Sequence, residues 1–180
     1  MRDGYLSTQF STDLDRLGFK ALRKVAGKQL DALQAALQEV ADDTAEAKVP
    51  VVLDAEARAY IRAMYERSSG KPLRCPDFEE VVQGSTWLAD PAFPDTVGDS
   101  FDTAGDIAPA GLLCLGEWKS GELWVLDVAT KAGYVYLVDE KRAIVPMFRG
   151  VGEFAQWAVA NELWKRRLAD ADDEVADRLA

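Results

Sequence analysis

The chain has 180 residues, of which 48% are hydrophobic, so a sizeable core is expected without disulfides or metals. It carries 21 basic and 31 acidic residues, a formal net charge of −10, and no histidine. Because histidine is the usual general base and metal ligand, its absence excludes Ser-His-Asp and Cys-His hydrolases, His-ligated zinc sites and His-dependent nucleases.

The N-terminus and the cysteines indicate a cytoplasmic protein. Residues 1–5 lack the basic start and apolar run of a signal peptide, and no stretch approaches the roughly eighteen apolar residues of a membrane span. Cys75 and Cys114 have no cysteine neighbours at metal-ligand spacing, which predicts reduced thiols rather than a metal site. We therefore expect no cofactor, no bound metal and no membrane contact.

A long helix is predicted over residues 13–41, with Thr12 as its N-cap. Gly18 and Gly27 each weaken that helix by up to about 1 kcal/mol relative to alanine, so its early part is expected to be broken or bent. Four apolar residues at intervals of three and four form its core face: Leu30, Leu33, Leu37 and Val40.

A second helix is predicted over residues 54–68, with Asp54 as its N-cap and an apolar face that includes Tyr60 and Met64. Residues 73–110 are then rich in Pro, Gly, Asp, Ser and Thr, which predicts loops and turns with one short helix or strand. Because so long a structureless loop is unusual in a compact domain, we expect aromatic side chains of this segment to pack down.

Four short apolar runs follow, at residues 112–115, 123–128, 134–138 and 143–148. Their short connections predict an antiparallel meander. Neither face of the second run is uniformly polar, which predicts a central strand with one side on helices and the other side partly covered. Pro146 indicates that the last strand lies at an edge of the sheet or ends at that residue.

A closing helix over residues 153–168 is expected to cover the sheet. The sequence thus predicts an α+β fold with N-terminal helices, an antiparallel β-meander sheet and a C-terminal helix packed on the sheet. One domain is expected over residues 1–180. Its parts are a helical region at about 12–70, the sheet and closing helix at about 110–168, and a frayed or helical acidic tail at 169–180.

Four segments within about residues 111–159 share a pattern of apolar strands bounded by glycines: Gly111-Leu-Leu-Cys-Leu-Gly116, Gly121-Glu-Leu-Trp-Val-Leu-Asp127, Gly133-Tyr-Val-Tyr-Leu-Val-Asp139 and Gly152-Glu-Phe-Ala-Gln-Trp157. In these segments the chain resembles the SUKH superfamily. This resemblance implies an α+β scaffold and, as in many bacterial members, service as an immunity protein that binds and neutralises a toxin. Members share the scaffold more than the binding residues, so the resemblance implies no particular site.

The negative charge is concentrated in one quarter of the chain. Residues 75–118 contain nine acids and no lysine or arginine, whereas the other residues hold 22 acids against 21 bases. Clustered like charges repel one another unless an opposite charge binds them, and an acidic surface attracts basic proteins while it repels nucleic acid. We therefore predict a basic protein partner, such as a toxin domain, and no nucleic-acid partner.

The predicted partner-binding residues are four aspartates with one aromatic anchor among them: Asp95, Asp99, Phe101, Asp102 and Asp106. No residue is predicted to be catalytic. The same acids also suit solvated turns, and their spacing does not match an EF-hand calcium loop. The sequence leaves open an adaptor module unrelated to toxin immunity and a histidine-free enzyme that uses carboxylates, and it does not indicate the oligomeric state.

Overall fold

A computed structural model describes residues 4–44, 50–67, 112–117, 123–129, 133–138 and 144–179. In chain order these residues form helices, a run of strands and a closing helix, which confirms the predicted α+β class. The elements are α1 (Tyr5–Thr8), α2 (Phe10–Arg16), α3 (Gly27–Thr44), α4 (Ala55–Arg67), β1 (Leu112–Glu117), β2 (Leu123–Asp127), β3 (Val135–Val138), β4 (Ile144–Phe148) and α7 (Val151–Leu179).

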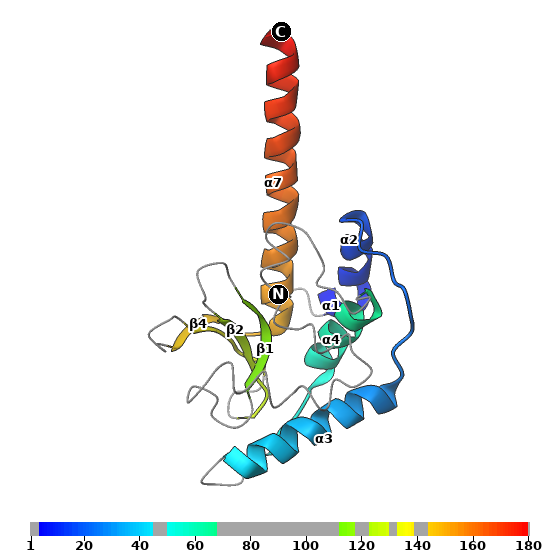
Figure 1. The fold of residues 1–180 in the computed structure, drawn as a ribbon, viewed down its shortest axis with the longest axis vertical. Coiled ribbons are helices and arrows are strands. Elements are labelled where there is room, and N and C mark those ends of the chain that lie inside the picture. Colours follow the sequence, from blue (N-terminus) through cyan, green and yellow to red (C-terminus); the bar gives the residue numbers. More distant parts are fainter. Residues whose placement is uncertain are drawn as a thin grey trace.

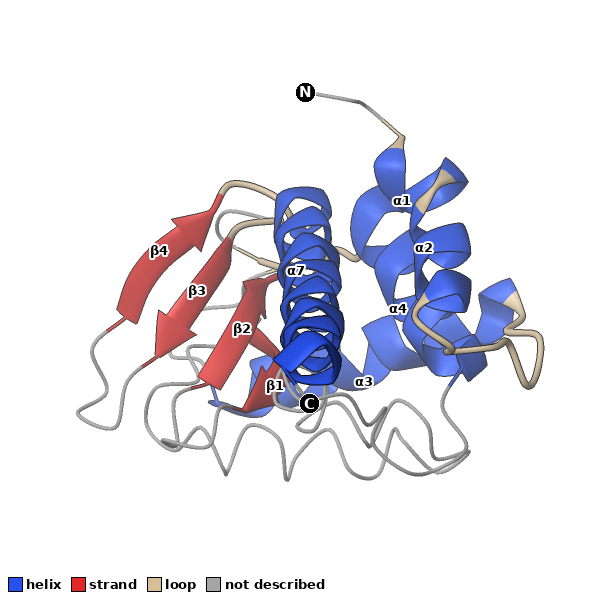
Figure 2. Ribbon diagram, turned by 90° about the horizontal axis from the view of Figure 1, so that it is seen from above, coloured by secondary structure: helices blue, strands red, loops and turns tan. Residues whose placement is uncertain are grey.

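The first half of α7 lies between the sheet and the N-terminal helices. Figure 2 shows the strands on one side of α7 and helices α1, α2 and α4 on the other, and α7 contacts α1, α2, α4 and β4. In Figure 1 the second half of α7 extends beyond every other labelled element. Helix α7 therefore packs against both sides of the molecule.

The strands form an antiparallel meander in the order β1-β2-β3-β4, as the sequence predicts. The central strand β2 pairs with β1 through Cys114 and Val125, and with β3 through Val125 and Tyr136. Side chains 124–128 are all buried, so both faces of β2 are covered. Pro146 is exposed and lies on the edge strand β4, where its missing N–H is tolerated.

Gly133 lies in the connection between β2 and β3. Its φ is 95°, a left-handed conformation that glycine adopts without steric strain, and its N–H donates to the carbonyl of Asp127 at 2.8 Å. The buried Asp127 carboxylate accepts a hydrogen bond from the Ala129 N–H at 2.9 Å. The glycine that closes the predicted connection thus has a conformational role.

An aromatic row runs through the core from α1 to the sheet. Tyr5 contacts Phe10 at 5.9 Å between ring centroids, and Phe10 stacks on Tyr60 at 5.6 Å. Tyr60 meets Phe154 of α7 edge-on at 6.1 Å, and Phe154 contacts Trp124 of β2 at 5.3 Å. Large aromatic rings therefore bury area continuously across all the layers.

The helix predicted over residues 13–41 is broken in its early part, as its two glycines led us to expect: residues 17–26 separate α2 from α3. The break occurs at Gly18, whose φ of 86° ends the helical path. Beyond it the chain packs on the end of α4, where the Leu22 N–H donates to the Glu66 carbonyl at 2.8 Å and the Val25 N–H donates to the Glu66 carboxylate at 3.2 Å. Thr12 lies inside α2 and is not an N-cap.

The rest of the N-terminal prediction agrees with the structure. Leu30, Leu33 and Leu37 are each at most 2% exposed, so the stripe on α3 faces the core; the side chain of Val40 lies outside the described part. Asp54 caps α4, accepting from the Ala57 N–H at 2.7 Å. The α4 helix spans nearly the predicted range.

Helix α7 is longer than the predicted 153–168 and includes the acidic tail, so the tail is helical as far as Leu179. The expectation that the whole of 153–168 covers the sheet is wrong at its end, because Leu163 is 39% and Trp164 60% exposed. Despite its length α7 is too polar to span a bilayer, and no other described helix has the length and apolar character that a membrane span requires.

Candidate binding surface

The predicted partner-binding residues lie outside the described part of the chain. Asp95, Asp99, Phe101, Asp102 and Asp106 all belong to residues 68–111. The structure does define where that segment is attached, because α4 ends at Arg67 and β1 begins at Leu112. The acid-rich stretch therefore connects the α4 end of the helical region to an edge strand of the sheet.

The residue at the first attachment point is a buried arginine. Arg67 is 5% exposed and donates to the Phe19 and Ser11 carbonyls, both at 3.0 Å, and to the Ala63 carbonyl at 3.1 Å. It also pairs with the Asp15 carboxylate at 3.1 Å. Because all three guanidinium nitrogens are used, Arg67 serves to hold α2 and the following loop against α4.

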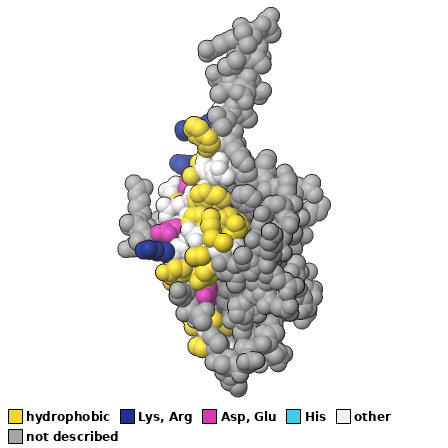
Figure 3. All heavy atoms as spheres, turned by 90° about the vertical axis from the view of Figure 1, so that its left-hand side faces the viewer, with side chains coloured by type: hydrophobic (Ala, Val, Ile, Leu, Met, Phe, Trp, Pro, Cys, Tyr) yellow, Lys and Arg dark blue, Asp and Glu magenta, His cyan; other side chains and the backbone are white. Residues whose placement is uncertain are grey.

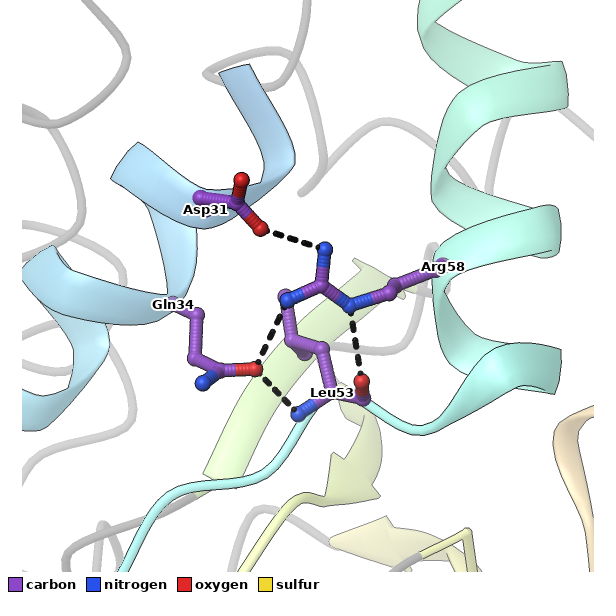
Figure 4. A network of polar contacts seen from close by, with 4 residues as sticks. All are labelled: Asp31, Gln34, Leu53 and Arg58. Carbon is purple, nitrogen blue, oxygen red and sulfur yellow. Dashed lines mark hydrogen bonds and ion pairs between the residues drawn. The ribbon is translucent and has the colours of Figure 1, made fainter. Parts of the chain in front are cut away.

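A second arginine network joins α3 to the start of α4 (Figure 4). Arg58 donates to Asp31 at 2.7 Å, to the Gln34 amide oxygen at 3.1 Å and to the Leu53 carbonyl at 2.9 Å. Gln34 also accepts from the Leu53 N–H at 3.0 Å. Next to it, the Val52 N–H donates to the Val128 carbonyl at 2.7 Å, which ties this segment to the end of β2. The role of this network is to hold α3, the segment before α4 and the sheet together.

The described surface that has the character of a binding face lies over β4 and the first half of α7. Figure 3 shows hydrophobic side chains gathered on this side of the molecule. Val145 and Met147 of β4 are 45% and 46% exposed. Phe148 of the same strand and Trp157 of α7 are partly buried, with their ring centroids 5.6 Å apart. We take the exposed apolar side chains of β4, called the apolar strip below, as the candidate binding surface of the described residues.

An irregularity in β4 shapes this strip. Val135 pairs with Phe148 and Tyr136 pairs with Pro146, so Met147 is the extra residue of a bulge. Pro146 has no N–H to offer to an added strand. The strip is therefore suited to side-chain contact rather than to extension of the sheet by a partner strand.

The polar groups beside the strip come from the start of α7 and from β3. Glu153 accepts from the Arg149 N–H at 3.2 Å. Burial, with the Asp127 carboxylate and Tyr134 as further causes, raises the pKa of Tyr136 above 10.0. The Tyr136 phenol therefore keeps its proton at neutral pH and can act as a hydrogen-bond donor.

Among the described residues, no group of three or more His, Cys, Asp or Glu side chains is placed to hold a metal ion. The chain matches no protein-family model, and no curated protein or solved structure shows significant similarity to it.

Sequence reasoning identified the edge position of β4 but not its exposed apolar strip. The signal was the run Ile144 to Phe148, which contains no polar residue although an edge strand ordinarily alternates. Arg67 and Arg58 were also missed, because an arginine near a helix end normally reads as an exposed charge.

Proposed function

We propose that this chain is a non-catalytic, cytoplasmic binding protein of the SUKH immunity type, which neutralises a basic toxin domain by covering it. The observation that carries the proposal is the charge distribution: residues 75–118 hold nine acids and no base, and so account for −9 of the net −10. A surface of that sign accelerates encounter with a cationic protein and disfavours nucleic acid.

Several basic groups of the scaffold are engaged elsewhere, which supports the proposal. Arg16 pairs with Asp13 at 3.3 Å, Arg58 with Asp31 at 2.7 Å and Arg67 with Asp15 at 3.1 Å. Each of these arginines compensates an acid within the N-terminal helices. These three arginines therefore already have carboxylate partners within the described helices.

The apolar strip on β4 supplies the second ingredient of a protein interface. Charged contacts chiefly set association rate and specificity, whereas desolvated apolar and aromatic anchors supply most of the affinity. Val145 and Met147 of β4 are exposed, and Phe148 of the same strand and Trp157 of α7 are partly buried. We propose that the acidic segment accelerates encounter with the toxin and that the β4 strip supplies most of the binding free energy.

Co-expression tests the proposal directly. Each open reading frame beside the gene for this chain is expressed from an inducible promoter in a heterologous bacterium, with and without the chain. One neighbour is expected to stop growth alone and to be tolerated in the presence of the chain, and its product is expected to be basic. The purified pair should form a complex whose association slows as salt rises.

A Val145→Asp, Met147→Asp variant tests the role of the apolar strip, because it introduces charge at two exposed positions. It is expected to lose protection against the toxin while retaining its melting temperature. If no neighbouring product is toxic, or if protection occurs without complex formation, the immunity role is wrong. An adaptor function is then favoured.

A further inference from the structure

Positive charge is concentrated where α2 connects to α3. From position 16 to position 30 the chain has five bases and no acid, although its net charge is −10. We call residues 16–28 the basic segment; its bases are Arg16, Lys20, Arg23, Lys24 and Lys28. In Figures 1 and 2 the connection from α2 to α3 lies on the side of the helices away from the strands. The basic segment is therefore separate from the apolar strip on β4.

Hydrogen bonds to the end of α4 hold the backbone of this segment in place. The Glu66 carbonyl accepts from the Leu22 N–H at 2.8 Å and from the Arg23 N–H at 3.2 Å. The Glu66 carboxylate accepts from the Val25 N–H at 3.2 Å, and the Val25 side chain is buried. A surface that is already ordered loses less conformational entropy when it binds. The segment is therefore pre-organised for contact with a partner.

An exposed leucine lies among the bases. The side chain of Leu22 is 62% exposed, the largest value among the large apolar side chains that the structure describes. Lys20 and Lys24 are also exposed, and each is two residues from Leu22, so their Cα atoms lie within about 7 Å of the leucine Cα. Protein interfaces have the same arrangement, an apolar centre with a polar rim.

The bases of the segment differ in their contacts. Arg16 pairs with Asp13 at 3.3 Å, and the guanidinium of Arg23 lies over the Tyr65 ring at 4.7 Å from its centroid. In contrast, no carboxylate in the described part of the chain forms an ion pair with any of the three lysines. Lys28 also stands in the first turn of α3, where the helix macrodipole disfavours positive charge. Carboxylates bound beside these lysines would relieve their mutual repulsion.

We propose that the basic segment docks on an acidic surface of a partner protein, with the leucine in an apolar recess and the lysines beside carboxylates around it. Charge complementarity selects an anionic partner, and the exposed leucine adds a contact that a purely ionic ligand does not use. A local patch of carboxylates also meets the lysines without extending over the rest of the chain, whose charge is negative.

Nucleic acid and membranes fit the segment less well. Proteins that bind single strands stack bases on aromatic rings, but Phe19 of this segment is half-buried and Tyr65, beneath Arg23, is buried. A long polyanion is also repelled by the net charge of −10. One leucine with three lysines gives only marginal attachment to an anionic membrane. The observations therefore favour an acidic protein.

Peptide binding to the full chain tests the proposal, which does not depend on toxin binding. The probe is a labelled peptide of about 18 residues, made of glutamate with leucine at helical spacing. Fluorescence anisotropy should show that it binds and that its affinity falls as salt rises. Lys20→Glu with Lys24→Glu should weaken binding at least about tenfold. Leu22→Ser should weaken it at least about fivefold, and a polyglutamate peptide should be insensitive to that change.

Matched controls make the same changes outside the segment. Arg149→Glu with Arg167→Glu alters the net charge equally at two exposed positions, and Val52→Ser removes an exposed apolar side chain. Both variants should bind the peptide within about twofold of the wild type, because salt screens distant charges. The segment variants should keep the wild-type melting temperature and should still protect against the toxin.

Several results would overturn the proposal. Absence of peptide binding at about 50 mM salt is one, and equal losses in the segment and control variants are another. A segment-dependent preference for an oligonucleotide or for anionic phospholipid vesicles would assign the segment to a different class of partner. A marked fall in the melting temperature of the Lys20→Glu, Lys24→Glu variant would also contradict it, because the lysines would then pair with acids of the chain itself.

Discussion

Single residues hold the N-terminal helices together more than their sequence positions indicate. Arg67 joins two backbone carbonyls from segments some fifty positions away to the end of α4, and its only described carboxylate partner, Asp15, is 42% exposed at its side chain. Its value therefore comes from satisfying buried carbonyls rather than from the ion pair. Unsatisfied buried acceptors are costly, so this contact is expected to dominate local stability.

Replacing Arg67 by methionine should lower the free energy of unfolding by about 2–4 kcal/mol, because it leaves the Ser11 and Phe19 carbonyls without their donor. Urea unfolding measures this change. Arg62→Met, at an exposed position of the same helix, is the control and should change stability by less than about 0.5 kcal/mol. Equal effects of the two substitutions would show that Arg67 has no special role.

Tyr5 makes the free energy of unfolding depend on pH in the alkaline range. Its hydroxyl donates to Asp13 at 3.1 Å, and burial together with that carboxylate raises its pKa above 10.0. The stabilisation is complete below pH about 10, and it declines at higher pH because the unfolded chain then releases a proton that the folded chain retains. Tyr5→Phe should cost about 1 kcal/mol at pH 7 and flatten the decline above pH about 10, as measured by urea unfolding. An unchanged slope would contradict this account.

At the scale of elements, local chemistry predicted most of the described fold. The leucine stripe of α3, the Asp54 cap and the four apolar runs each use a periodicity or a turn residue that acts within a few positions. The break expected in the early part of the helix over 13–41 occurs at residues 17–26, where Gly18 ends the first helix, but the competing partner of the next backbone N–H groups, Glu66, was not predicted. That competitor lies about forty positions away, beyond the reach of a local pattern.

The cap at the start of α4 makes a measurable contribution. Asp54→Ala removes the acceptor of the Ala57 N–H and should lower the free energy of unfolding by about 1 kcal/mol, as followed by thermal or urea denaturation. Asp54→Asn keeps an acceptor oxygen at the same place and should retain most of the stability. A loss as large in the asparagine variant would point to charge rather than capping.

At the scale of the whole molecule, the function depends on features that sequence periodicity does not report. The exposed strip of Val145 and Met147 arises because β4 is an edge strand with a bulge, which follows from sheet order and not from the strand itself. The charge asymmetry, in contrast, is plain in the sequence, although its spatial arrangement cannot be derived from counting acids.

Neutralising the predicted acidic residues should slow binding without unfolding the protein. Replacing Asp95, Asp99, Asp102 and Asp106 by asparagine is expected to lower the association rate with the toxin about tenfold or more at low salt and to flatten its salt dependence. Stopped-flow kinetics at several ionic strengths measure both. Asparagine at four acids outside this segment is the control, and unchanged kinetics in the first variant would assign these aspartates to solubility.

The contact between Trp124 and Trp157 gives the fold its own optical reporter. Their ring centroids are 5.4 Å apart and the planes are inclined by 45°. Two indoles at that separation and tilt couple their transitions, which produces an exciton couplet in the circular dichroism spectrum. Since one indole belongs to β2 and the other to α7, the couplet reports whether α7 is packed against the sheet. It does so independently of the helical content of the backbone.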